Sequence, residues 1–325
     1  MNYEIKDCID AGTEYCPCSL AETGDCILCS QLQGKDFCDC INWKGVCIFQ
    51  EYDWNNNKAK TLRKVSLATI IEKEILNEDL VCFTILCTHK LVQDLSIPGS
   101  FIFVRNPKSN SYFDSPISIM ETLPEENLVK IVIELKGVKT KNINLLEKND
   151  NMAIKGPYWN GVLGLKNLDK CKDGISLLIA RGIGMAPMIP VMRKLYASGN
   201  KIIALIDKSN YKDLFIKKYL EMCNADVIEC NILSNGNLSS DAKDIIKQYE
   251  NKVNLIYCSV TDILISKILE FANDDANFAC CNNAKMCCGE GVCGACSVRY
   301  AGHNMKKMCK VQIDPRYIFK GRRLL

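Results

Sequence analysis

One stretch of the chain decides the expected fold: residues 175–187 read ISLLIARGIGMAP. Its first six residues form a short apolar run of the kind found in buried strands. Gly182 and Gly184 follow at once, and Pro187 suits the first turn of a helix. The order of strand, glycine turn and helix predicts one unit of a parallel α/β sheet.

The glycine turn has two interpretations. It lets backbone amides approach a pyrophosphate at the start of a helix, or it is simply a tight turn between a strand and a helix. Pro187 stands where the third glycine of G-x-G-x-x-G would be. Asp207 ends the next expected strand and suits a ribose 2′-hydroxyl, which favours NAD, whereas Lys208 and Ser209 suit a 2′-phosphate.

The unit repeats along the chain on the C-terminal side of this stretch. Further strands are expected at 201–206 and 254–258, and helices at 190–197, 214–222 and 263–271. On the N-terminal side, residues 61–160 read as short strands, rich in β-branched and aromatic residues, at 81–87, 100–104 and 128–135. Close spacing with intervening turn signals predicts a barrel or a sandwich there.

Cysteine is the compositional anomaly of the chain. There are 21 in 325 residues, with eight between Cys8 and Cys47 and seven between Cys280 and Cys309. The N-terminus carries no secretory signal, so we expect a cytoplasmic protein with reduced thiols. Two dense clusters therefore favour metal or redox chemistry over a disulfide framework.

The C-terminal cluster has the spacing C-x4-C-x2-C-x12-C. The expected ligands are Cys288, Cys293, Cys296 and Cys309. Four thiolates at such spacing are typical of a [2Fe–2S] cluster, and the interspersed glycines allow a tight loop. A zinc site is the alternative, although only one short cysteine knuckle is present. Cys287 beside Cys288 leaves the first ligand ambiguous.

The N-terminal cluster contains C-x-C and C-x2-C pairs and no histidine. Its thiols can supply one or two four-thiolate sites, holding a [4Fe–4S] cluster or structural zinc, and disulfides are the third interpretation. The cysteines concerned are Cys8, Cys16, Cys18, Cys26, Cys29, Cys38, Cys40 and Cys47.

Charge and hydropathy exclude two classes of partner. Lys and Arg number 41 and Asp and Glu 38, so the formal charge of +3 gives no electrostatic footprint for nucleic acid. No apolar run approaches the roughly 20 residues of a membrane helix. We therefore expect no nucleic-acid partner and no membrane partner.

Taken in this order, the motifs resemble ferredoxin-reductase-type subunits that bind FAD, NAD(P) and an iron–sulfur cluster. The similarity is to the electron-transfer subunit of NAD-linked dihydroorotate dehydrogenase and to the small subunit of NADH-dependent reduced ferredoxin:NADP oxidoreductase, also described as sulfide dehydrogenase. It covers roughly residues 60–315. The segments 286–296 and 308–310 match the cluster region of these families.

The resemblance implies a set of flavin-binding and nicotinamide-binding residues. Ser115 stands where the Arg of an Arg-x-x-Ser flavin signature is usual, so one phosphate contact is lost, and Cys258 keeps the cysteine of a Cys-Gly-Pro turn whose other residues differ. Arg181 stands where glycine is common. The implied cofactor-binding residues are Pro116, Ile117, Ser118, Lys136, Gly137, Thr140, Gly156, Gly182, Gly184, Ala186, Pro187, Asp207 and Cys258.

The expected architecture is a multidomain one that combines α/β and all-β parts. We expect a Cys-rich metal-binding extension at 1–50 and an antiparallel FAD-binding β-barrel at 51–165. A parallel NAD(P)-binding α/β domain at 166–277 and a small [2Fe–2S] domain with a basic tail at 278–325 complete it.

The expected function is electron transfer between NAD(P)H, FAD and a [2Fe–2S] cluster, to or from a catalytic partner subunit in a hetero-oligomer. No catalytic acid or base is expected, because cofactors supply the chemistry. Two alternatives stay open: a metal- or redox-sensing module on a degenerate reductase scaffold, and a self-sufficient NAD(P)H:acceptor reductase.

Overall fold

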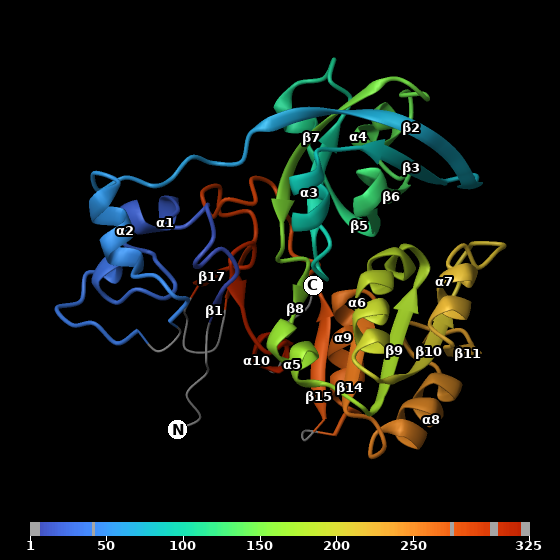
Figure 1. Ribbon diagram of the computed structural model, residues 1–325. Helices are drawn as coiled ribbons and strands as arrows, with labels where there is room; N and C mark the ends of the chain where they lie inside the picture. The colour runs from blue at the N-terminus through green and yellow to red at the C-terminus, as the bar shows by residue number, and fades with distance from the viewer. Residues whose placement is uncertain (1–6, 41–42, 274–275, 300–304, 320–325) are drawn as a thin grey trace. The chain divides into compact units, whose positions relative to one another are not determined.

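The computed structural model describes residues 7–40, 43–273, 276–299 and 305–319. The chain forms two compact units (Figure 1). We call Met1–Lys64 with Ala284–Ile313 the cysteine unit, and Val65–Asn283 with Asp314–Leu325 the barrel–sheet unit. Each is described by itself below.

The barrel–sheet unit begins with a closed barrel of six antiparallel strands. Its strands run in the order β2, β3, β6, β5, β4, β7 around the barrel. Their bounds are β2 (Val65–Asn77), β3 (Leu80–Leu86), β4 (Phe101–Arg105), β5 (Ser115–Leu123), β6 (Leu128–Glu134) and β7 (Asn151–Tyr158). Closure leaves no free strand edge, which protects such a sheet from pairing with other chains.

Side chains point alternately to the two faces of each strand, and the inward-pointing ones fill the barrel. Ile70, Phe83 and Ile131 belong to one buried apolar cluster, which short helices α3 (His89–Asp94) and α4 (Val138–Ile143) complete through Val92 and Ile143. Thr88 caps α3 by accepting a hydrogen bond from the Leu91 N–H.

The second part of this unit is a six-stranded sheet in the order β11, β10, β9, β14, β15, β8. All neighbouring strands are parallel except β8, which pairs antiparallel with β15. The strands are β8 (Val162–Leu163), β9 (Ile175–Arg181), β10 (Lys201–Asp207), β11 (Asp226–Glu229), β14 (Leu255–Ser259) and β15 (Asn277–Cys281). The order reverses between β9 and β14, which makes their carboxyl ends the topological switch point.

Helices connect these strands. They are α5 (Leu165–Lys170), α6 (Met185–Ala197), α7 (Lys217–Met222), α8 (Ser240–Tyr249), α9 (Asp262–Leu269) and α10 (Arg316–Phe319). A short pair of strands, β12 (Leu233–Ser234) and β13 (Asn237–Leu238), precedes α8. Helix α6 packs on β9 and β10 and also contacts β5 of the barrel.

A buried carboxylate strengthens the contact between barrel and sheet. Glu121 on β5 accepts hydrogen bonds from the Tyr219 hydroxyl at 2.6 Å and from Arg193 Nη1 at 3.1 Å. Burial and the bond to Glu121 raise the pKa of Tyr219, so its hydroxyl keeps its proton and stays a donor.

The described residues of the cysteine unit form short elements. They are β1 (Asp7–Cys8), α1 (Ser19–Glu22), η1 (Gln31–Gln33), α2 (Ile48–Trp54), β16 (Ser297–Arg299), β17 (Met305–Lys307) and β18 (Val311–Gln312). Strand β1 pairs antiparallel with β18, so the N-terminal and C-terminal cysteine segments share one sheet. An apolar cluster of Ala21, Cys29 and Leu32 supports this unit.

The predicted antiparallel barrel and parallel α/β sheet are confirmed. The division of the chain differs from the four predicted pieces, because pairing of β1 with β18 joins the two cysteine segments. Helix α2 also runs past the expected boundary at residue 50. Helix α6 begins at Met185, before the predicted start at Pro190, because Pro187 in its first turn needs no hydrogen-bond partner.

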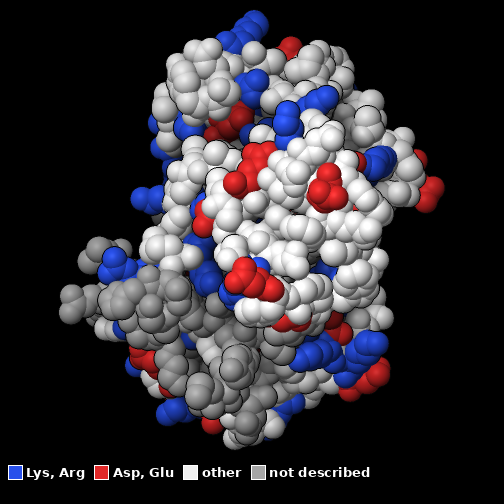
Figure 2. All heavy atoms as spheres, turned by 90° about the vertical axis from the view of Figure 1, so that its left-hand side faces the viewer, with Lys and Arg blue, Asp and Glu red and all other residues white. Residues whose placement is uncertain are grey.

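The charged surface and the helices each add one observation. In the coloured part of the face that Figure 2 shows, Lys and Arg side chains lie intermingled with Asp and Glu. Within the described parts of the chain, no helix combines the length and the apolar character that crossing a membrane requires.

Replacing Glu121 tests the contact between barrel and sheet. Tyr219 is a buried residue, only 2% exposed, and Glu121→Ala leaves its hydroxyl without an acceptor. We expect the free energy of unfolding to fall by about 1–3 kcal/mol, measured by denaturant titration. Glu126→Ala at an exposed position is the control. Equal stability of the two variants would contradict the assignment.

Candidate functional site

The glycine turn lies at the switch point of the sheet. Gly182–Gly184 form a 3-10 turn between β9 and α6, and Gly182 has a φ of +55°. A Cβ on Gly184 would lie 2.0 Å from the Ser259 carbonyl oxygen at the end of β14. Only glycine fits this close approach, and the turn leads into the N-terminus of a helix of 13 residues.

Ala186 and Pro187 occupy the first turn of α6. Ala186 is buried against the sheet cluster. The four predicted residues therefore lie together at the carboxyl end of β9, beside the switch point near which open α/β sheets bind ligands. Their role in binding NAD(P) stays a prediction.

Asp207 ends β10 as expected, but its carboxylate is already engaged. Oδ2 accepts hydrogen bonds from Arg181 Nε at 2.9 Å and from the Ile232 N–H at 3.0 Å, and Oδ1 accepts one from the Ser209 N–H at 2.7 Å. The carboxylate thus organises the loop after β10 and orients Arg181. Lys208 forms an ion pair with Glu229 at 3.0 Å. Ribose recognition by Asp207 stays a prediction.

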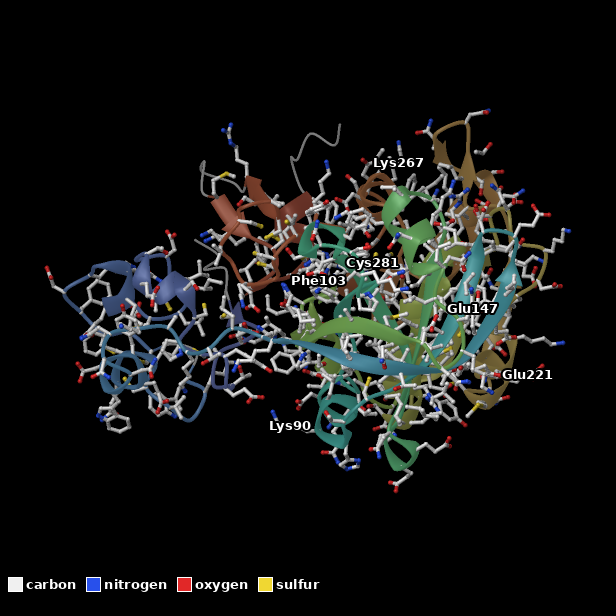
Figure 3. The ribbon with its side chains drawn as sticks, turned by 90° about the horizontal axis from the view of Figure 1, so that it is seen from above. Lys90, Phe103, Glu147, Glu221, Lys267 and Cys281 are labelled. Atoms are coloured by element: carbon white, nitrogen blue, oxygen red, sulfur yellow. The ribbon has the colours of Figure 1, made fainter. Side chains whose placement is uncertain are left out.

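Cys258 lies inside the sheet, where it pairs in register with Cys280 on β15. Burial raises the pKa of the Cys258 thiol well above its usual value. Figure 3 labels Cys281, whose sulfur donates to the Val260 carbonyl oxygen at 3.3 Å. The contact between Cys258 and the nicotinamide stays a prediction.

The predicted flavin residues of β5 face an aromatic strip on the barrel. Ser118 pairs in register with Phe101 on β4, and Phe101 stacks on Tyr158 of β7 with ring centroids 5.2 Å apart. Pro116 pairs with Phe103, which Figure 3 labels. Ile117 packs toward the barrel core instead, because side chains alternate along a strand.

The second predicted flavin segment precedes α4. Lys136 forms an ion pair with Glu134 at 2.8 Å, and Gly137 caps the helix. The Thr140 hydroxyl oxygen accepts the Gly137 N–H at 3.3 Å, which holds this turn in place. Gly156 on β7 has a close neighbour too, since a Cβ there would lie 2.7 Å from Ile102 Cγ2.

Three cationic side chains gather next to Ser115, and sequence analysis missed them. They surround Asp114: Arg105 Nη1 lies 2.7 Å from Oδ1, Lys155 Nζ lies 3.8 Å from Oδ2, and Lys139 Nζ donates to the Asp114 carbonyl oxygen at 3.3 Å. One carboxylate cannot neutralise three cations. A surplus of positive charge therefore stands beside the position where the flavin signature lacks its arginine.

In the cysteine unit, two of the four predicted ligands of the C-terminal loop lie beside each other. Pairing of β16 with β17 brings Cys296 beside Cys309, and the hydrogen bond from Cys309 lowers the pKa of the Cys296 thiol to about 6. The Cys288 sulfur accepts hydrogen bonds from the N–H groups of Glu290 at 3.3 Å and Cys293 at 3.4 Å.

Positive φ angles explain the glycines of this loop. Gly289, Gly291 and Gly294 have φ values of 71°, 77° and 72°. These values place the residues in the left-handed region that side chains disfavour. Cys293 and Cys287 are exposed, whereas Cys288 is half-buried. The choice of Cys288 as the first ligand stays a prediction.

The N-terminal cysteines fall into two groups. Cys8, Cys16, Cys18 and Cys26 line one small pocket. Cys29 is buried, Cys47 is half-buried, and Cys38 and Cys40 are exposed with their sulfurs 3.3 Å apart. Burial raises the pKa of Cys16 to about 12 and raises the pKa values of Cys8, Cys18 and Cys26 as well.

A buried ion cluster joins the two cysteine segments, and sequence analysis missed this as well. Arg63 donates to Asp10 Oδ1 at 2.9 Å and to Glu290 Oε2 at 3.0 Å, and Lys310 Nζ lies 3.2 Å from Glu290 Oε2 and contacts Asp10. All four side chains are at most 6% exposed. Asp10, Glu290 and Lys310 lie within two residues of Cys8, Cys288 and Cys309 in the sequence, whereas Arg63 has no cysteine nearby that could have indicated its role.

The charges in this cluster support one another. Burial alone would raise the pKa of the Asp10 carboxyl, but Lys310 and Arg63 outweigh burial and hold that pKa below its usual value. Burial alone would lower the pKa of Lys310, but Asp10 and Glu290 raise it above its usual value. Both groups therefore stay ionised at neutral pH.

None of these clusters has the geometry of a single-ion site. Across residues 7–40, 43–273, 276–299 and 305–319, no three His, Cys, Asp or Glu side chains are placed so that they could hold one metal ion. The predicted iron–sulfur and zinc sites therefore stay predictions at this point.

Replacing Gly184 tests the turn at the switch point. In Gly184→Ala the new methyl group collides with the Ser259 carbonyl, so we expect a shifted turn and a melting temperature lowered by several degrees. Gly137→Ala, where an added Cβ meets nothing within 4 Å, is the control for stability. The close approach is refuted if Gly184→Ala melts at the wild-type temperature in a thermal scan.

We compared the sequence of this chain with those of known proteins. No family model matches the chain. The electron-transfer subunit of dihydroorotate dehydrogenase B (NAD(+)) from Fusobacterium nucleatum is 29% identical over 216 residues, which cover 63% of this chain and 79% of the relative. The subunit of the same name from Bacillus cereus is 22% identical over 255 residues, which cover 76% of this chain and 95% of the relative.

Solved structures support the fold. A structure of NADH-dependent reduced ferredoxin-NADP oxidoreductase superimposes with a TM-score of 0.61 at 23% identity, covering 75% of this chain and 86% of the other. The CS-b5R domains of human Ncb5or superimpose with a TM-score of 0.51 at 14% identity, covering 68% and 70%. The resemblance predicted from sequence is therefore confirmed: the chain has a ferredoxin-reductase-type fold and is similar to the electron-transfer subunits of dihydroorotate dehydrogenase B.

Proposed function

We propose that this chain is the electron-transfer subunit of an NAD(P)-dependent flavoprotein oxidoreductase. It moves electrons between NAD(P)H, FAD and a [2Fe–2S] cluster, to or from a partner subunit. The observation that carries the proposal is a glycine turn at the switch point of a parallel sheet, in one compact unit with a closed barrel. The names of the similar proteins support the same role.

The nicotinamide cofactor is assigned to the crevice beyond β9 and β14. Gly182 and Gly184 let the backbone approach a pyrophosphate, and α6 adds its positive N-terminal dipole. Arg181, which Asp207 orients, offers a further cation at this edge of the sheet. Ser259 closes the crevice on the opposite side.

FAD is assigned to the barrel strip. Ser118 offers a hydroxyl to the isoalloxazine edge, beside the stacked rings of Phe101 and Tyr158. We assign the diphosphate to Lys139 and Lys155 next to Ser115, because ammonium groups bind phosphate oxygens through charge-assisted hydrogen bonds. These lysines would replace the missing arginine of the flavin signature.

The [2Fe–2S] cluster is assigned to Cys288, Cys293, Cys296 and Cys309. The donor set of four sulfurs fits this cluster, and backbone N–H groups aimed at a ligand sulfur stabilise its negative charge. When bound, flavin and cluster supply hydride acceptance and one-electron transfer, and this chain holds, orients and shields them. A carrier of this kind requires a catalytic partner, so we propose a hetero-oligomer.

A pair of adjacent cysteines tests the cluster assignment. After anaerobic purification, we expect Cys288→Ser to lose about two irons and two sulfides per chain while the matched variant Cys287→Ser keeps them. Bleaching of the flavin absorbance by NADH should persist in both variants. Equal iron in the two variants refutes Cys288 as a ligand, and absent flavin with no response to NADH favours the sensing alternative.

Two lysines test the flavin assignment. We expect Lys139→Ala and Lys155→Ala each to weaken FAD binding about tenfold, which corresponds to about 1.4 kcal/mol. The measurement is the FAD bound per chain after dialysis and the dissociation constant of re-added FAD. Lys148→Ala, at an exposed position of the same unit, should bind FAD normally. Unchanged affinity in both test variants would place the diphosphate elsewhere.

A further inference from the structure

Four of the eight N-terminal cysteines converge on one place in the cysteine unit. Cys8 comes from β1, Cys16 and Cys18 from the loop before α1, and Cys26 from the loop after it. We propose that these four residues hold a [4Fe–4S] cluster, separate from the cluster assigned to the C-terminal loop. This site goes beyond the proposed function and does not depend on the flavin assignment.

The walls of the pocket suit a cluster. Apart from Asp10 and the four cysteines, its lining is apolar, consisting of Ala11, Pro17, Leu20, Ala21, Ile27, Leu28 and Ile48. An apolar lining excludes water, and solvent exposure is one of the factors that set the potential of an iron–sulfur cluster. The sticks of Figure 3 show sulfur atoms, in yellow, on the blue N-terminal segment.

The remaining N-terminal cysteines have other surroundings. Cys29 packs into the apolar cluster with Ala21 and Leu32, next to Cys26, but it does not itself line the pocket. Cys38 and Cys40 are exposed, and Cys47 stands before the first turn of α2. The structure thus separates four pocket cysteines from four that do not line the pocket, a division that sequence spacing left open.

A backbone hydrogen bond reaches a pocket sulfur. The Cys29 N–H donates to Cys26 Sγ at 3.4 Å. A neutral thiol sulfur is a weak acceptor, whereas a metal-bound thiolate is a strong one. The same arrangement surrounds Cys288 in the C-terminal loop.

The donor set and its spacing favour a cluster over one zinc ion. Four cysteine thiolates are the usual ligands of a [4Fe–4S] cluster, and the pocket lining contains four cysteines and no histidine. The pair Cys16 and Cys18 lacks the usual two-residue to four-residue spacer of a zinc knuckle.

The site is built against the C-terminal loop of the same unit. Cys8 pairs in register with Val311, and the Ile9 N–H donates to the Lys310 carbonyl oxygen at 2.9 Å. Leu20, which lines the pocket, lies close to Gly291 of the C-terminal loop: a Cβ added to Gly291 would be 3.2 Å from Leu20 Cδ2. If the C-terminal loop holds its own cluster, as proposed above, the two centres are neighbours in one folded unit.

Metal and sulfide content of the full chain tests the proposal. After anaerobic purification we expect about six irons and six sulfides per chain, of which about four of each belong to the pocket. Cys18→Ala should lose about four irons and keep two, whereas the matched variant Cys40→Ala should keep all six. A preassembled [4Fe–4S] cluster enters by ligand exchange: each of the four thiols gives up its proton and replaces one ligand of the incoming cluster, so no iron changes oxidation state.

Several results would overturn the site. The site is overturned if the wild-type chain contains two irons or fewer. It is also overturned if zinc takes the place of the four irons expected in the pocket. Equal loss in Cys18→Ala and Cys40→Ala, or no loss in Cys18→Ala, overturns the ligand set. If Cys18→Ala fails to fold by circular dichroism, Cys26→Ala replaces it.

The two iron sites fail separately in this design. Loss of about two irons in Cys288→Ser with four retained supports both sites. Absence of the two-iron portion, with four irons that disappear in Cys18→Ala, rejects the C-terminal assignment and supports the pocket.

Discussion

The cysteine unit depends on the buried ion cluster of Asp10, Arg63, Glu290 and Lys310. Isolated charges in such a position would be unstable, because removal from water costs several kcal/mol for each ion. Here two cations face two anions, so the cluster is neutral. Each charge needs partners from a distant part of the chain. The N-terminal segment, residue 63 and the C-terminal loop must therefore fold together.

This requirement has a consequence for the cysteines. The short strands β1 and β18 would hardly hold together alone, since two residues form few ladder bonds. The ion cluster fixes their register and thereby places Cys8 on the pocket and Cys309 beside Cys296. Both sulfur sets thus share one scaffold, which suits a unit that carries electrons through more than one centre.

The barrel–sheet unit follows a different logic, in which local sequence decides most of the outcome. Strands β9 and β10 and the glycine turn were predictable, because apolar runs and glycine act over a few residues. The start of α6 was missed: the helix begins at Met185, and Pro187 and Pro190 both lie within it. The hydrogen bonds of the Asp207 carboxylate could not be predicted either, because its partners Arg181 and Ile232 are distant in sequence.

The sequence by itself determined the classes of structure: an antiparallel barrel, a parallel sheet with a glycine turn, and two clusters of thiols. Periodicity, turn residues and cysteine spacing are local properties, and they can be read directly. Only the tertiary structure decided which cysteines line one pocket, which charges are buried and which cations gather around Asp114. Those relations depend on contacts between residues such as Asp10 and Lys310, and no local pattern records which distant partner a side chain will find.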